Sequence, residues 1–184
     1  MGRKHSHCTY CGNGFADGQP WPRRCGRCNH ESYLNPLPVS VLLQPVEREA
    51  GLGLLLIRRN IPPHVGRLAL PGGYIEFHET WQAAAARELY EEAGVRIDAH
   101  SVREFRVRSA GAGLILIFGL GTPIRESELP PFSENFEVSE RVVVSGPTEM
   151  AFPLHGEAVR DYFAGVQRRA RGQTVRRHPI SGKP

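Results

Sequence analysis

The most informative run of this 184-residue chain reads Gly73-Tyr-Ile-Glu-Phe-His-Glu79-Thr-Trp-Gln-Ala-Ala-Ala-Ala-Arg87-Glu88-Leu-Tyr-Glu91-Glu92-Ala-Gly94-Val95. Its alanine-rich middle predicts a helix that begins after Thr80, because a threonine side chain can cap the first turn. The helix is expected to end at Ala93, since Gly94 can adopt the left-handed conformation that follows many helices. The run therefore predicts a glycine turn, Pro71-Gly72-Gly73, followed by one capped helix.

Three carboxylates lie close together near the end of this helix. Glu88, Glu91 and Glu92 are spaced i, i+3 and i+4, so they share one helix face. They repel one another, and the helix C-terminus adds partial negative charge at the same place. Taken alone, such a cluster is more typical of a solvated face. If it is functional, it needs a cation, and a divalent metal is a better candidate than Arg87 alone.

The whole run, called the box below (residues 73–95), favours the functional interpretation. It fits the pattern Gly-x5-Glu-x7-Arg-Glu-apolar-x-Glu-Glu-x-Gly-apolar at every fixed position, and it resembles the signature of the Nudix hydrolases. The resemblance implies an α/β fold, an α/β/α sandwich with a mixed sheet. It also implies an enzyme, a Nudix pyrophosphohydrolase that binds Mg²⁺ or Mn²⁺ and hydrolyses a diphosphate linked to a nucleoside.

The same resemblance implies a role for particular residues. The expected ligands of Mg²⁺ or Mn²⁺ are Gly73 (through its carbonyl), Glu88, Glu91 and Glu92. The expected catalytic residues are Arg87, Glu88, Glu91, Glu92 and Glu137, with Glu79 pairing with Arg87 so that Arg87 orients Glu88. Glu137 is the candidate general base on a loop after the later strands, and Glu140 is the alternative. The expected substrate-binding residues are Arg58, Gly72 and Gly73.

All four cysteines lie near the start of the chain, as Cys8-x2-Cys11 and Cys25-x2-Cys28. Paired Cys-x2-Cys turns are typical of a structural site with four thiolates around Zn²⁺. Gly12 and Gly26 would allow the tight turn that each pair needs. Two disulfides are the alternative, but thiols stay reduced in the cytoplasm. We therefore expect a zinc ribbon over residues 1–35.

Outside the ribbon, we expect the Nudix domain over residues 36–170 and a basic, disordered tail over residues 171–184. The patterns predict strands at 39–43, 52–57, 67–70, 102–108, 114–118 and 141–144, a polar turn at 44–51, a loop at 122–140 and a last helix at 154–169. The first two strands should form a hairpin.

Composition sets the expected setting of the protein. No apolar run is long enough for a transmembrane helix, and no secretory signal follows the basic start, so a cytoplasmic location without a membrane partner is expected. The net charge of +4 is concentrated at the two ends of the chain. Basic ends can contact nucleic acid, but a solvated tail is the simpler interpretation. A nucleotide is thus the expected partner, and a homodimer would be in keeping with the family.

Further motifs indicate a branch of the family. The cysteine pairs, Tyr33-x-Asn35-Pro36 and Leu70-Pro-Gly-Gly-Tyr-Ile-Glu76 resemble the zinc-ribbon subgroup of FAD and ADP-ribose pyrophosphatases. This implies a substrate such as FAD, ADP-ribose or a related dinucleotide or ADP-sugar, with release of AMP where adenosine is present. The alternative is the branch of NADH pyrophosphatases and RNA-decapping enzymes, although its Ser-Gln-Pro-Trp-type motif does not follow Val95. A third hypothesis is a nucleic-acid-binding regulator that uses a Nudix domain to sense a ligand.

Overall fold

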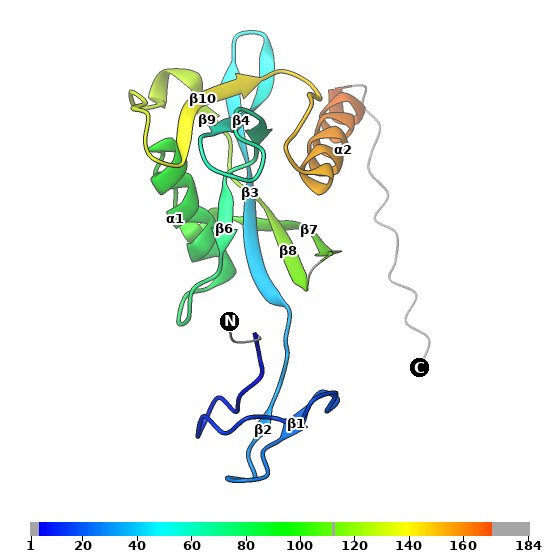
Figure 1. Cartoon of the computed structure of the whole chain (residues 1–184). Helices are drawn as coiled ribbons and strands as arrows, with labels where there is room; N and C mark the ends of the chain where they lie inside the picture. The colour runs from blue at the N-terminus through cyan, green and yellow to red at the C-terminus, as the bar shows by residue number, and fades with distance from the viewer. Residues whose placement is uncertain (1–3, 112, 171–184) are drawn as a thin grey trace. The chain divides into compact units, whose positions relative to one another are not determined.

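The computed structural model describes residues 4–111 and 113–170, and the predicted tail at 171–184 lies outside them. The chain divides into two compact units, Met1–Leu37 and Pro38–Pro184 (Figure 1). Among the described residues, no helix has the length and apolar character needed to cross a membrane.

The first unit is a small ribbon with one short hairpin. Strands β1 (Arg23–Arg24) and β2 (Glu31–Ser32) pair antiparallel. In each Cys-x2-Cys turn an N–H returns to the first cysteine carbonyl, from Gly12 to Cys8 (3.0 Å) and from Asn29 to Cys25 (2.9 Å). Gly12 has the expected left-handed backbone, but in the second turn Asn29 takes that conformation rather than Gly26.

The second unit contains an eight-stranded mixed sheet whose main path runs β10-β4-β3-β8-β7. The main strands are β3 (Leu37–Arg48), β4 (Gly51–Arg59), β7 (Arg103–Ala110), β8 (Leu114–Leu120) and β10 (Val138–Val144). Three shorter strands pair with inner strands of this path: β5 (Leu68–Ala69) pairs with β4, β6 (Gly72–Tyr74) pairs with β3, and β9 (Ile124–Arg125) runs parallel to β3.

Two helices cover the two faces of the sheet, α1 (Trp81–Ala93) and α2 (Pro153–Ala170), and short 3₁₀ turns lie at Ala99–Ser101 and Glu126–Glu128 (Figure 1). Alternate strand residues serve opposite faces. Leu42 of β3 packs in the cluster that includes Leu89 of α1, whereas Leu43 packs with Val159 of α2. The predicted α/β/α sandwich with a mixed sheet is confirmed.

Three local predictions need correction. The polar turn expected at 44–51 is only the bend at Glu49 and Ala50, because β3 continues to Arg48. Gln44 can stay buried there because its Nε2 donates to the carbonyl of Thr122 (2.7 Å), and Val46 is fully buried. The glycine turn at 71–73 is partly the strand β6, which pairs with β3. The loop expected at 122–140 contains β9, a 3₁₀ turn and the start of β10.

Candidate active site

Helix α1 is capped as predicted, and this sets the position of its carboxylates. The Thr80 hydroxyl accepts a hydrogen bond from the N–H of Ala83 (3.1 Å). At the other end, Gly94 has a φ of 71°, and its N–H donates to the carbonyl of Tyr90 (2.9 Å). Both caps satisfy backbone groups that the helix leaves unpaired at its ends.

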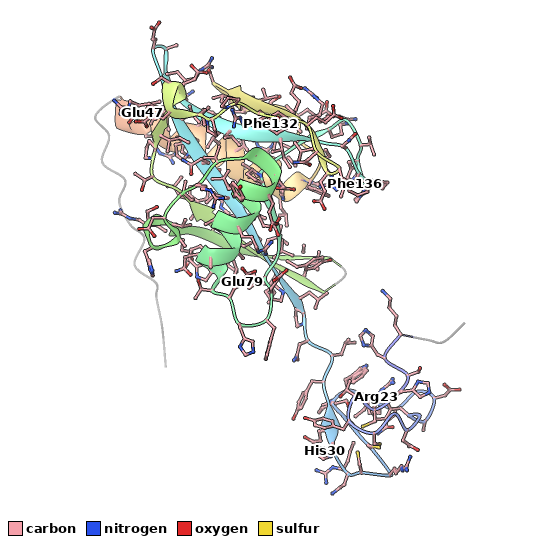
Figure 2. All side chains as sticks on the ribbon, turned by 90° about the vertical axis from the view of Figure 1, so that its left-hand side faces the viewer. Arg23, His30, Glu47, Glu79, Phe132 and Phe136 are labelled. Atoms are coloured by element: carbon pink, nitrogen blue, oxygen red, sulfur yellow. The ribbon has the colours of Figure 1, made fainter. Side chains whose placement is uncertain are left out.

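Arg87 holds several carboxylates together. Its guanidinium makes a two-bond pair with Glu79 (2.8 and 3.2 Å), the pairing that the resemblance implied. It also donates to Glu88 (2.8 Å) and Glu91 (3.0 Å), and to the carbonyl of Tyr74 (3.0 Å). Arg87 lowers the pKa of Glu79, and the planar fork of an arginine suits such a multiple contact. Glu79 lies on the turn that leads into α1 (Figure 2).

Glu92 is the most buried of the three box carboxylates, with only 6% of its surface exposed. It accepts a hydrogen bond from the N–H of Gly72 (2.8 Å). Burial raises its pKa to about 8, and the nearby negative charges of Glu88 and Glu137 act in the same direction. The carboxyl therefore lies in a place where an added cation would favour its ionised form.

Glu88 lies directly against the glycine strand β6. Burial raises its pKa, although Arg87 partly opposes this. A Cβ on Gly73 would come within 2.3 Å of Glu88 Oε1, so a side chain there would displace the carboxylate. A Cβ on Gly72 would come within 2.4 Å of the carbonyl oxygen of Ser40 on β3. Both glycines are thus required by close approach, one to the site and one to the sheet.

The structure brings Glu137 toward the box, because its charge acts on both Glu88 and Glu92. Its loop is tied to α1: Asn135 accepts from the Glu137 N–H (2.9 Å) and donates to the carbonyl of Glu91 (3.1 Å). Arg141 of β10 also donates to the carbonyl of Ala93 (2.8 Å) at the end of α1. The loop and the helix end are therefore held together.

Arg58 and Arg59 have different surroundings. Arg58, expected to bind substrate, instead donates to Glu140 (2.7 Å) and to the carbonyl of Gly66 (2.9 Å). It does not line the cavity next to the box. Arg59 does line that cavity, and its guanidinium lies 5.2 Å from the centre of the Phe152 ring. Sequence reasoning missed Arg59; the Arg58-Arg59 pair at the strand end was the available signal.

The cavity next to the box has a volume of about 430 Å³. Gly72, Gly73 and Tyr74 form its box end, and Arg59 lies nearby. The remaining walls come from the sheet and from the start of α2: Val39, Val41, Pro63, Ala69, Leu70, Ala110, Leu114, Leu116, Phe152, Pro153, Leu154 and His155. A mostly apolar cavity with a few polar groups is typical of a small-molecule site.

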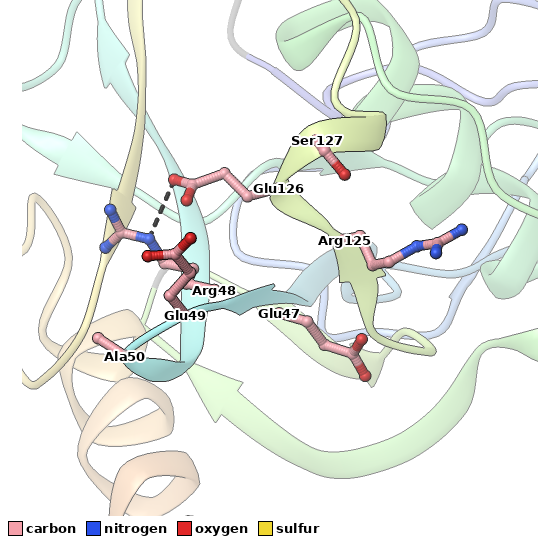
Figure 3. A pocket seen from close by; sticks show the side chains of 7 residues that line it. All are labelled: Glu47, Arg48, Glu49, Ala50, Arg125, Glu126 and Ser127. Carbon is pink, nitrogen blue, oxygen red and sulfur yellow. Dashed lines mark hydrogen bonds and ion pairs between the residues drawn. The ribbon is translucent and has the colours of Figure 1, made fainter.

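A larger hollow of about 680 Å³ lies at the β3–β4 turn (Figure 3). It is lined by Glu47, Arg48, Glu49, Ala50, Arg125, Glu126 and Ser127, and Arg48 pairs with Glu126 across it (3.0 Å). It is formed at the opposite end of β3 from the part that pairs with β6, and no box residue lines it. We therefore place the candidate site at the smaller cavity.

The two predicted metal clusters differ in geometry. Among the described residues, the one group of three or more metal-ligating side chains whose ligand atoms all lie within 4.8 Å of one another is Cys8, Cys11, Cys25 and Cys28. The backbone N–H groups of Cys28 and Arg27 lower the pKa of Cys25 to about 6, which favours a thiolate ligand. The box carboxylates are not gathered in this way, since Arg87 and Gly72 hold them.

Comparison with known proteins identifies the domain. Residues 35–119 match the family model of the NUDIX domain. The chain carries a NUDIX domain. The NUDIX hydrolase from Nitrosomonas europaea is similar over 94% of this chain and 96% of its own, with 25% sequence identity and a TM-score of 0.69.

Curated relatives match the NUDIX domain at lower coverage. The NAD-capped RNA hydrolase NudC of Salmonella heidelberg is 28% identical over 96 residues, which is 52% of this chain and 35% of that protein. The NudC of Edwardsiella ictaluri is 31% identical over the same length. The match thus spans about a third of these relatives. A Francisella tularensis structure, a bifunctional NMN adenylyltransferase/ADP ribose pyrophosphatase, shares the fold at 22% identity and a TM-score of 0.51, covering 62% of this chain and 35% of that one.

Proposed function

We propose that this chain is a metal-dependent Nudix pyrophosphohydrolase. It hydrolyses the diphosphate bond of a nucleoside-diphosphate-linked compound such as FAD, ADP-ribose or a related dinucleotide or ADP-sugar, and releases AMP where adenosine is present. The observation that carries the proposal is the complete box, with its Arg87-braced carboxylates beside the glycine end of a cavity of about 430 Å³.

The donor set of the box fits Mg²⁺ or Mn²⁺, which prefer oxygen ligands. Glu88, Glu91 and Glu92, with the carbonyl of Gly73, would hold the ion. The raised pKa values of Glu88 and Glu92 support this, because they report negative charge that is crowded and partly desolvated. When bound, such an ion neutralises phosphate charge and activates water.

The chain's own residues supply position and a proton acceptor. Arg87 fixes the direction of Glu88, and the two glycines leave room for a phosphate close to the backbone. Glu137 is the proposed base: it takes the proton from the attacking water as the water oxygen bonds to one phosphorus and the bridging P–O bond breaks. The products are two phosphate monoesters. Glu140 is the weaker candidate because it is paired with Arg58.

The base assignment has a matched pair of variants. Glu137→Gln should lower kcat by roughly 10²–10⁴-fold, the usual contribution of a general base. Glu140→Gln removes a charge from the same segment and should change kcat little. Equal losses in the two variants would count against Glu137.

A second candidate function is hydrolysis of NAD-capped RNA, because the matching NudC proteins are NAD-capped RNA hydrolases. A panel with Mg²⁺ or Mn²⁺ separates the candidates: FAD, NADH, ADP-ribose, ADP-sugars, coenzyme A, nucleoside triphosphates and NAD-capped RNA, read by product masses. The proposal expects AMP from one or more dinucleotides or ADP-sugars. Activity on triphosphates alone would overturn it, and a salt-sensitive nucleic-acid shift without any hydrolysis would favour the regulator hypothesis.

The ribbon has a separate role in the proposal. Cys8, Cys11, Cys25 and Cys28 hold a structural Zn²⁺, which suits the closeness of their sulfur atoms and the backbone N–H of Arg27 that donates to Cys25 Sγ (3.4 Å). Four reduced thiols also suit the cytoplasm. The metal content of the purified protein, measured by mass spectrometry, tests the zinc assignment.

A further inference from the structure

A buried histidine at the start of α2 has no part in the chemistry described so far. His155 is only 6% exposed, and its Nδ1 accepts a hydrogen bond from the backbone N–H of Leu70 (3.2 Å). Its ring meets Phe118 edge-on (5.8 Å between centres) and lies tilted against Phe152 (5.0 Å). Burial lowers the pKa of His155 to about 3, so the imidazole is neutral near pH 7. Because Nδ1 accepts, we assign the ring proton to Nε2.

The Nε2–H group of His155 donates to no other group among the described residues. Within the described part of the chain, Leu70 provides the one hydrogen bond of His155. Among the described residues, Nε2 of His155 is not one of the fully buried side-chain polar atoms that lack a partner. It therefore keeps contact with open space, and the open space that His155 lines is the cavity next to the box.

The rest of the cavity restricts what could accept this hydrogen bond. Its walls are largely apolar, and none of its lining residues carries a carboxylate. Arg59 and Tyr74 are the other lining residues with polar side chains. A positively charged group would find no anionic partner there. A flat, neutral ring with an unprotonated ring nitrogen fits the apolar walls, the Phe152 ring and the Nε2–H donor.

The same cavity reaches the box, because Gly73 and Tyr74 line it together with His155. Arg59 also lines the cavity, and its charge acts on both Glu92 and His155. A nucleotide whose diphosphate meets the carboxylates can therefore extend its base past Arg59 toward α2.

We propose that His155 reads the heterocyclic base of the substrate by donating its Nε2–H to a ring nitrogen, with Phe152 against the ring. This inference rests on the proposed function and adds a specificity-determining residue to it. His155 binds the base, at a distance from the bond that breaks, so it acts on KM rather than on kcat.

Two variants separate the two nitrogens of the ring. In His155→Asn, the amide oxygen can replace Nδ1 as acceptor for Leu70, but the side chain is too short to replace Nε2. In His155→Gln, the longer amide can place an N–H near the position of Nε2 while the Leu70 contact is lost. His64→Asn is the matched control, because His64 also contacts Phe152 (5.4 Å) but does not line the cavity.

The substrates for the test are ADP-ribose and its 1-deaza, 3-deaza and 7-deaza adenine analogues, in which one ring nitrogen becomes C–H. With the natural protein and with H64N, one analogue should lose about 10- to 100-fold in kcat/KM through KM, because the donor is left unpaired. That loss should shrink to within about 3-fold in H155N and persist in H155Q. Equal kcat/KM for all four compounds, or an undiminished loss in H155N, would overturn the proposal.

Failure of the proposed function gives a different result. If ADP-ribose is not hydrolysed at all, the substrate assignment is wrong, and the base site is tested by binding of AMP instead. In ¹⁵N-histidine NMR spectra, the Nε2 signal of His155 should shift on saturation with AMP, and with 1-, 3- or 7-deaza-AMP one shift should be lost. An unchanged signal with AMP would overturn the role of His155 independently of catalysis.

Discussion

The cysteine cluster of the ribbon and the glutamate cluster of α1 are both suited to metal ions, but they are built differently. The four sulfur atoms lie within 4.8 Å of one another, and short backbone turns hold them. The three box carboxylates are instead engaged by protein groups, Glu88 and Glu91 by Arg87 and Glu92 by the N–H of Gly72.

This difference corresponds to two uses of a metal. A ribbon of about 35 residues has little apolar core, so a closed metal site would supply folding energy that the core cannot. The NUDIX domain folds around two large apolar clusters, and its carboxylates do not have to hold it together. They can therefore be arranged for a substrate, with ligand positions that stay available.

The largest effect should come from the ribbon. Removing Zn²⁺ with a chelator, or making Cys25→Ser, should unfold residues 4–37 and leave the NUDIX domain folded. Structural zinc contributes apparent binding energies of about 10–16 kcal/mol in small domains. Hydrogen exchange read by mass spectrometry would show protection lost in the ribbon alone. Tyr10→Phe, at an exposed ribbon position, is the control; full protection of the ribbon in C25S would contradict the prediction.

Glu92→Gln should act on catalysis and spare the fold. The amide oxygen can still accept from the N–H of Gly72, but it is a much weaker ligand for Mg²⁺. We expect kcat to fall roughly 10³-fold, about 4 kcal/mol of barrier. Steady-state rates and a thermal melt measure the two effects. Glu104→Gln, an exposed substitution on β7, is the control and should change neither kcat nor the melting temperature. Retained activity in E92Q would show that Glu92 is not a metal ligand.

Arg87→Lys tests whether the carboxylates need a planar brace. Lysine keeps the charge but cannot make the paired contact with Glu79 while also reaching Glu88 and Glu91. Misplaced ligands should cost about 10- to 100-fold in kcat, with a smaller change in KM. Arg103→Lys on the exposed surface of β7 is the matched control. If R87K and R103K have the same rate, charge alone is sufficient.

The smallest effect is a pH dependence of stability in the metal-free protein. The pKa of Glu92 is raised from 4.5 to about 8, so between these values the folded state binds the proton more tightly than the unfolded state. The free energy of unfolding should therefore fall as pH rises through this window, by at most about 1.4 kcal/mol per unit.

His155 contributes with the opposite sign, but only at lower pH. Its pKa of about 3 in the folded state lies below the ordinary histidine value of 6.5, so its contribution to stability is complete above pH 6.5. Urea unfolding of the zinc-loaded, Mg²⁺-free protein between pH 6.5 and 8 therefore follows Glu92 without a contribution from His155. The slope should be smaller in E92Q and smaller again in the natural protein with saturating Mg²⁺. The same slope in all three samples would contradict the raised pKa.

The box was predictable because its information is local. The caps at Thr80 and Gly94 and the spacing of the glutamates follow from residues a few positions apart, and the Glu79–Arg87 pair was implied by the resemblance to the Nudix signature. The β3 extension was harder, since Gln44 is satisfied only by the carbonyl of Thr122, which is 78 residues away. A polar residue such as Gln44 indicates a turn when only the neighbouring sequence is considered, because its distant hydrogen-bond partner is not visible there.

The cavity could not be predicted for the same reason. Its walls combine residues from 39 to 155, and the sheet brings them together only through its strand order. Arg58 and Arg59 illustrate the limit: they are neighbours in sequence, and only the structure shows that Arg59 lines the cavity. His155 could not be distinguished from the other residues of the last helix, because the neighbouring sequence does not indicate its contact with Leu70.

Arg141 has a consequence beyond its two hydrogen bonds. It donates to the carbonyl of Ala93, where α1 concentrates its partial negative charge, and to the carbonyl of Pro130, on the segment that leads to Glu137. A strand residue thus acts as counterion for the helix and as anchor for the loop. The positions of the carboxylates on the helix and on the loop therefore both depend on Arg141. A shift in the register of β10 would move Arg141, and with it both the end of α1 and the loop that carries Glu137.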